Sequence, residues 1–281
     1  QKYFPLLDNK GNLLSRFLMV SNIKTNKSAA IISGNERVLQ ARLADAEFFF
    51  DQDRKKTLAS RIKKLGGVVY HSKLGMLSDR VERVSKIAQA IGLQLGGKKL
   101  AALASEVAML AKADLLTDMV GEFPELQGIM GRYYAKHDGM SDELAFAIED
   151  HYKPRFSGDD LPRNMAGICV ALADKLEILI GMFGIGQTPS GDKDPFALRR
   201  HAFGVVRILV QKNLDINLYE LIILAQEKMP ENIRHNTKND PALINNFLLD
   251  RVRRYFSDQG NDYHAIESVV SPFGGTTPLG T

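Results

Sequence analysis

The chain has few of the features that mark secreted or membrane-bound proteins. Its one cysteine, Cys169, lies in an apolar run, so no disulfide framework can form within one chain. No apolar stretch reaches the length of a membrane span, and residues 1–4 resemble no secretory signal. We therefore expect a protein of the reducing cytoplasm without membrane contact. Because the first residue is Gln and not Met, we also expect a piece of a longer polypeptide.

A strong charge of one sign is also missing. Among 281 residues, 37 are Lys or Arg and 33 are Asp or Glu, which gives a net charge of +4. This mild basic excess permits a nucleic-acid partner without requiring one. Hydrophobic residues make up 44% of the chain, enough to bury the core of one large domain or two modest ones.

The apolar pattern divides the chain. A turn at 8–12 and a strand at 16–20 precede a helical pattern, whereas from residue 57 apolar residues recur at helical spacing almost to the end. The fold class that we predict is mainly α. We expect a small α+β element (1–56), a helical bundle (57–215), a helical linker region (216–270) and a flexible tail (271–281).

Local signals predict where several helices begin and end. Capping-box spacing at Ser33 favours a helix start there, and a long helix beginning near residue 74 is expected to end near Gly92. Another long helix is expected to end at Gly184. Asp-Pro pairs at 194–195 and 240–241 each predict a helix start, because aspartate accepts free N–H groups and proline presets φ.

Two carboxylates fall on apolar helical stripes. Asp114 and Asp174 both follow buried-type residues at helical spacing, so each must be paired, hydrogen-bonded, protonated or bound to metal. Together with His71 they give an order of His, Asp and Asp that is similar to the HD phosphohydrolase superfamily. In that superfamily a His, a His-Asp pair and a distant Asp hold a divalent metal.

The chain departs from that pattern at residue 113. Ala113 precedes Asp114 where the superfamily has its imidazole ligand, so we expect a degenerate site that holds no metal. Two alternatives stay open. The chain could retain metal-dependent phosphohydrolase activity, or the three residues could form a structural polar cluster with a lysine such as Lys112 or Lys175.

Basic residues gather in short runs. Lys193, Arg199, Arg200 and Arg207 lie on or beside one expected helix, a grouping that suits phosphate, although a solvated charged face is the commoner reading. Further basic runs occur at 54–56, at 61–64 with Lys63 and Lys64, and at 251–254. If these runs converge on one face with tyrosines between them, the face would suit an RNA backbone with base stacking.

Four sequence blocks resemble a known family. Residues 34–50, 127–134, 155–162 and 183–200 closely resemble the beta subunit of bacterial two-subunit glycyl-tRNA synthetase, in the same order along the chain. The resemblance implies a middle fragment, with the end of an editing-domain-like region, a degenerate HD domain and the start of a linker. In that family the alpha subunit activates glycine with ATP and magnesium, and the beta subunit binds tRNA.

The resemblance also implies what this chain does. It would be part of a glycine-tRNA ligase, with no catalytic residue and no cofactor of its own, and its partners would be tRNA(Gly) and the alpha subunit. We expect Lys63, Lys64, Lys193, Arg199, Arg200 and Arg207 to contact the tRNA. A metal-dependent HD-type phosphohydrolase and a purely structural helical spacer are the alternatives.

Overall fold

The chain forms two compact units, one up to Phe48 and one from Phe49 onward. The computed structural model describes residues 3–22, 24, 26, 28–236 and 239–273. Helices dominate both units, which confirms the mainly α prediction. The division that we predicted at 56/57 and 215/216 stays a prediction, and residues 274–281 of the predicted tail lie outside the described residues.

The first unit contains a β-hairpin and most of a long helix. β1 (Tyr3–Leu7) and β2 (Leu13–Met19) pair antiparallel, and the Asp8 carboxylate accepts two backbone N–H groups of the connecting turn, both at 2.8 Å. α1 (Ser28–Asp53) follows and continues into the second unit. The predicted helix start at Ser33 is wrong, because the chain is already helical before this residue.

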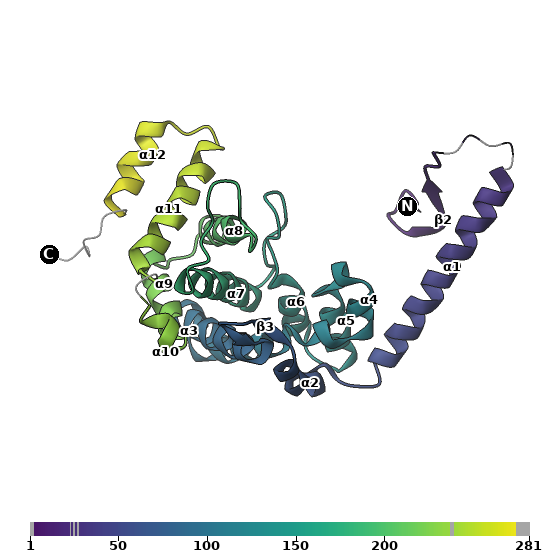
Figure 1. The fold of residues 1–281 in the computed structure, drawn as a ribbon, viewed down its shortest axis with the longest axis horizontal. Helices are drawn as coiled ribbons and strands as arrows, with labels where there is room; N and C mark the ends of the chain where they lie inside the picture. The colour runs from purple at the N-terminus through teal and green to yellow at the C-terminus, as the bar shows by residue number, and fades with distance from the viewer. Residues whose placement is uncertain (1–2, 23, 25, 27, 237–238, 274–281) are drawn as a thin grey trace. The chain divides into compact units, whose positions relative to one another are not determined.

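The second unit is built from helices with one short hairpin, as the ribbon in Figure 1 shows. In chain order its elements are α2 (Leu58–Arg61), η1 (Ile62–Gly67), β3 (Val69–His71), β4 (Gly75–Met76), α3 (Leu77–Leu110), η2 (Ala113–Leu116), α4 (Asp118–Glu122), η3 (Pro124–Leu126), α5 (Ile129–His137), α6 (Asp142–Asp150), α7 (Met165–Gly184), α8 (Leu198–Gln211), α9 (Leu218–Glu227), α10 (Glu231–Arg234), α11 (Pro241–Ser257), α12 (Tyr263–Val270) and η4 (Ser271–Phe273).

α7 is the central helix of this unit. It is buried along almost its whole length, and it contacts α3, α6, α8 and α9. The Asn164 side chain accepts the N–H of Gly167 at 2.8 Å and so caps the start of α7, while the predicted end at Gly184 is confirmed. A helix buried on almost all sides belongs to the protein core, and its charged residues need partners there. Among the helices of the described chain, none combines the length and the apolar character needed to cross a membrane.

α3 is a folded-back pair of helices. Gly97 has non-helical dihedral angles (φ +72°, ψ −165°) and separates the two halves. A Cβ atom placed on Gly92 would lie only 2.9 Å from the Cα of Ala101, and the Ser85 hydroxyl lies 2.9 Å from that of Ser105. These contacts are possible only if the halves run back along each other. The predicted end near Gly92 is therefore wrong, because that glycine serves a close helix contact and the turn comes later.

Replacing Gly92 with alanine is expected to destabilise the fold by about 1–3 kcal/mol, the usual cost of overpacking. In an ordinary helix the same change would stabilise by up to about 1 kcal/mol. Here the added methyl group meets backbone atoms of the opposing half, which cannot rotate away. Urea unfolding measures the difference. Gly121→Ala is the control, because nothing lies within 4 Å of its added Cβ, and a Gly92→Ala variant as stable as wild type would contradict the close contact.

α8 begins later than its sequence signal indicates. Asp194 does accept helix N–H groups, from Leu198 at 2.8 Å and from Arg199 at 2.9 Å. However, Pro195 is not the first helical residue, because Ala197 has a left-handed conformation (φ +53°) and the helix starts only after it. The prediction was right about the acceptor and wrong about the first turn.

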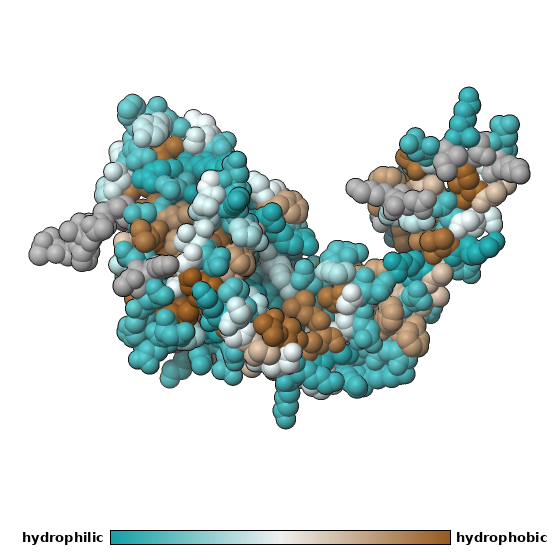
Figure 2. All heavy atoms as spheres, in the orientation of Figure 1, coloured by the Kyte–Doolittle hydropathy of each residue, from teal (hydrophilic) through white to brown (hydrophobic). Residues whose placement is uncertain are grey.

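α11 and α12 form a helical pair at the end of the described chain. Asp240 caps α11 by accepting the N–H of Ala242 at 2.9 Å, which confirms the predicted start. Leu249 packs with Ile266 and Val270 in a small apolar cluster that holds the two helices together. Figure 2 shows mostly hydrophilic residues on the face of this pair that it displays.

Candidate nucleic-acid interface

A buried ion-pair network joins α3 to α7. Glu177 of α7 accepts the Arg83 guanidinium at 2.7 and 2.9 Å and the Arg80 Nε at 2.9 Å. Arg80 also donates to Asp174 at 3.1 Å. The two arginines are three positions apart on α3, and the two acids are three positions apart on α7. Each pair therefore lies on one face of its helix. The two acids of α7 are therefore matched by two arginines of α3.

Lys112 adds a further cation to Asp174. Its Nζ lies 3.2 Å from the Asp174 carboxylate and 3.9 Å from the centre of the Tyr152 ring. Burial alone would raise the pKa of Asp174, but Arg80 and Lys112 hold that pKa well below its usual range. Burial lowers the pKa of Lys112 to about 8, although Asp174 opposes this shift. Of the alternative polar cluster of His71, Asp114 and Asp174 with a lysine, the pair of Asp174 with Lys112 is present.

Asp114 is also buried, but its surroundings differ. Its Oδ2 accepts the backbone N–H groups of Gly128 and, at 3.2 Å, of Gly131. Its other oxygen has no hydrogen-bond partner within the described residues. Burial raises the pKa of this carboxyl, and the N–H of Gly128 is the main opposing influence.

His71 lies away from these contacts. It ends β3, its Nδ1 accepts the N–H of Lys73 at 3.1 Å, and its ring lies 6.1 Å from that of Phe196. Within the described ranges no group of three or more His, Cys, Asp or Glu residues is arranged to hold a metal ion. The residues present do not fit a divalent metal, because two basic side chains already bind Asp174 and backbone N–H groups occupy one oxygen of Asp114.

Of the six basic residues expected to meet tRNA, four are exposed and one is buried. Lys63 and Lys64 lie exposed on η1, and Lys193 and Arg200 lie exposed before and at the start of α8. Arg199 is partly exposed and donates to the Gly191 carbonyl.

Arg207 is the buried member of the set. Its guanidinium donates to the carbonyls of Phe156 at 3.3 Å and Asp159 at 3.0 Å. It therefore fixes the loop that precedes α7. Arg155 stabilises the same loop from within, since its guanidinium binds the Asp159 carboxylate at 3.0 Å. The contacts of Arg207 with the two carbonyls use the guanidinium N–H groups with which this residue would bind a phosphate.

Two of the basic runs do converge. α8 packs on α11, and the charge of Arg199 on α8 acts on Arg251 of α11, which also feels its helix neighbour Arg254. Burial lowers the pKa of Arg251; Asp250 opposes this shift, and the like charges of Arg199 and Arg254 add to it. Arg251 also lies over the Phe247 ring, 4.2 Å from its centre. We call Arg199, Arg251 and Arg254 the α8–α11 basic cluster. Lys63 and Lys64 have no described contact with it.

The arginine partners of Asp174 and Glu177 could have been found from the sequence. Arg80 and Arg83 interrupt an apolar stripe three residues apart, and Glu177 follows Asp174 at the same spacing. Two charged pairs with equal spacing and opposite sign predict facing helices. The convergence of Arg199 with Arg251 carries no such signal.

Comparison with known proteins gives a consistent result. A family model described as glycyl-tRNA synthetase beta subunit matches residues 1–271. Glycine--tRNA ligase beta subunits from Thiobacillus denitrificans and Polaromonas naphthalenivorans are 58% and 60% identical over 271 residues, which is 96% of this chain and 38% of each relative. The chain thus spans well under half the length of these relatives. The resemblance seen in the sequence is confirmed, and the chain belongs to the glycyl-tRNA synthetase beta subunit family.

Proposed function

We propose that this chain is part of the tRNA-binding subunit of a glycine-tRNA ligase of the cytoplasm. It binds tRNA(Gly), while the alpha subunit uses ATP and magnesium to activate glycine and attach it to the tRNA. The degenerate HD region contributes shape and positive potential and performs no chemistry. Similarity to relatives named as beta subunits of this ligase supports the proposal.

The α8–α11 basic cluster is the observation that carries this function. Arg251 is close enough to both Arg199 and Arg254 for their charges to act on it, and the Arg254 side chain is 75% exposed. Asp250 lies 3.9 Å from Arg251 and Asp258 lies 3.8 Å from Arg254, so neighbouring acids offset part of this positive charge. Arginine donates in a planar fork that matches phosphate oxygens, and phosphate contacts supply most of the affinity for a nucleic acid.

We propose different roles for the other basic residues. Lys193 and Arg200 extend the positive surface near the start of α8, and Lys63 with Lys64 forms a separate basic point on η1. Arg207 acts by holding the loop that contains Phe156 and Asp159. A direct phosphate contact by Arg207 stays a prediction that its burial does not favour.

Arg254→Ala in the full-length beta subunit is expected to weaken binding of tRNA(Gly) about tenfold. One exposed charged contact is lost, and such contacts contribute at least about 1.5 kcal/mol. The slope of log affinity against log salt should also fall by about 1, because one fewer phosphate is neutralised. Titration of labelled tRNA(Gly) over a salt series measures both quantities.

Lys86→Ala is the matched control, since it removes the same charge from an exposed residue of α3 that lies 3.9 Å from Glu82. It should leave both quantities close to wild type. No binding of tRNA(Gly) by the wild-type subunit at low salt would refute the proposed function. Unchanged affinity in Arg254→Ala and Arg199→Ala would favour the structural spacer.

A further inference from the structure

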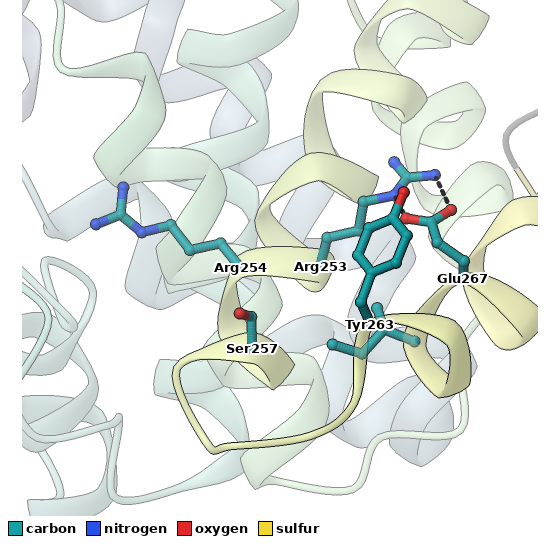
Figure 3. Close-up of a pocket in the computed structure, with 6 residues that line it drawn as sticks. Arg253, Arg254, Ser257, Tyr263 and Glu267 are labelled. Atoms are coloured by element: carbon teal, nitrogen blue, oxygen red, sulfur yellow. Dashed lines mark hydrogen bonds and ion pairs between the residues drawn. The ribbon is translucent and has the colours of Figure 1, made fainter.

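A small pocket lies between α11 and α12, directly beside the α8–α11 basic cluster. It has a volume of about 250 Å³, and its lining consists of Arg253, Arg254, Ser257, Tyr263, Ile266 and Glu267. Figure 3 shows the Tyr263 ring beside the paired Arg253 and Glu267, with Arg254 extending away from them. Arg254 is thus shared between the pocket and the basic cluster.

The walls of this pocket are held in place without a ligand. Arg253 donates to Glu267 at 2.7 and 3.3 Å and to Asp250 at 3.1 Å, so one arginine connects both helices. Ile266 forms the apolar floor and belongs to the cluster that joins α11 to α12. A pocket whose walls are fixed beforehand binds with a smaller loss of conformational entropy.

Tyr263 is the unusual member of the lining. It is the first residue of α12, and 67% of it is exposed, although its ring lies over a formed pocket. An exposed aromatic face next to arginine is the arrangement on which unpaired bases stack. The hydroxyl of Ser257 and the carboxylate of Glu267 can hydrogen-bond the edge of a planar polar group.

The size and the charge of the pocket limit which kind of chemical group can bind in it. Pockets for whole small-molecule ligands usually start at about 300 Å³, so this one suits a smaller, flat group. Arg254 lines the pocket and also belongs to the α8–α11 basic cluster, where a chain of phosphates would lie. A planar group attached to a polyanion is a nucleobase of an RNA strand.

We propose that the pocket between α11 and α12 accepts one unpaired nucleobase of the bound tRNA, stacked on Tyr263, while the adjoining phosphates lie on the α8–α11 basic cluster. This inference rests on the proposed tRNA-binding function. The inference adds a base-stacking subsite to the α8–α11 basic cluster, which we otherwise expect to bind tRNA through its positive charge. Arg253 is a positioning residue here, because Glu267 and Asp250 already hold its guanidinium.

The test compares variants of Tyr263 in the full-length beta subunit, with labelled tRNA(Gly) over a salt series. Tyr263→Ala should weaken binding by about 5- to 150-fold, the range for loss of one base stack. The salt slope should stay at the wild-type value, since no phosphate contact is lost. Tyr263→Phe should bind nearly as well as wild type, because the ring remains.

Tyr219→Ala serves as the matched control, because Tyr219 is also exposed and also lies in the first turn of its helix. It should bind as the wild type does. If wild type binds and Tyr263→Ala binds equally well, the base subsite is refuted while the proposed function stands. A fall in the salt slope of Tyr263→Ala would also refute stacking. Absence of binding by wild type would refute the proposed function itself.

Discussion

Asp174→Ala is expected to lower the free energy of unfolding by about 3–5 kcal/mol, the usual loss when one partner of a buried ion pair is removed. The Asp174 carboxylate binds Arg80 at 3.1 Å and Lys112 at 3.2 Å, and all three side chains are largely shielded from water. Without it, Lys112 loses its ion-pair partner and keeps only the weaker influence of Asp114 among nearby acids, while Arg80 keeps its ion pair with Glu177. Urea unfolding of wild type and variant measures the difference.

An exposed ion pair provides the control for this prediction. Glu82→Ala removes a carboxylate that lies 3.9 Å from Lys86 at the surface of α3, and such pairs contribute at most about 1 kcal/mol. A loss below about 1 kcal/mol in Asp174→Ala would show that the network contributes little to stability.

Wild type and Asp174→Ala should also differ in how strongly acid destabilises them. Arg80 and Lys112 overcome burial and depress the pKa of Asp174 in the folded state. A group with a depressed pKa contributes stability that is fully present above its unfolded pKa of about 4 and lost as the pH falls further. Wild type should therefore lose stability below about pH 4, and Asp174→Ala should lose less. Unfolding at pH 6 and pH 3 compares them.

Asp53→Ala is expected to cost a similar amount, about 3–5 kcal/mol, because one buried carboxylate serves several donors. Asp53 accepts the Tyr134 hydroxyl at 2.9 Å, the N–H groups of Asp118 and Met119 at 3.0 Å, and the Arg61 guanidinium at 3.1 Å. Its loss removes the acceptor of the first two N–H groups of α4 and the carboxylate that binds Arg61, although Thr117 still caps α4 and Arg61 still donates to the carbonyl of residue 53. Thermal and urea unfolding both report the change.

Asp51→Ala is the matched control for Asp53→Ala. Asp51 lies on the same helix two residues earlier, but it is exposed and its ion pair with Arg54 is 3.6 Å long. Its replacement should change stability by no more than about 1 kcal/mol. Equal stability of the two variants would contradict the role assigned to the buried carboxylate.

The sequence predicted burial better than it predicted partners. Asp114 and Asp174 lie in the core, as their apolar stripes indicate, since periodicity shows which face of a helix is covered. Periodicity does not show which helix covers it. Asp174 meets two basic side chains, whereas Asp114 meets backbone N–H groups at the start of α5, and the difference depends on tertiary packing.

The ends of the helices show the same difference between what local sequence predicts and what tertiary packing decides. Gly184 ends α7 and Asp240 starts α11, because both signals act on their own helix. Gly92 does not end a helix, because its missing side chain accommodates Ala101 of the returning half of α3. A glycine that permits a close helix contact and a glycine that stops a helix are the same letter in the sequence.

The sequence did not distinguish exposed basic residues from buried ones. Arg200 and Arg207 lie on the same predicted helix, yet one is exposed and the other donates to loop carbonyls inside the protein. The meeting of Arg199 with Arg251 depends on how α8 packs against α11, which local patterns do not encode.

The cations that neutralise Asp174 are covalently part of the polypeptide. A protein whose core acid is neutralised by a dissolved ion has a folding equilibrium that shifts with the concentration of that ion, by mass action. Arg80 and Lys112 cannot be diluted, chelated or exchanged for a competing ion. At this position the chain supplies its own counterions during synthesis, so this part of its stability is the same in ion-poor and ion-rich surroundings.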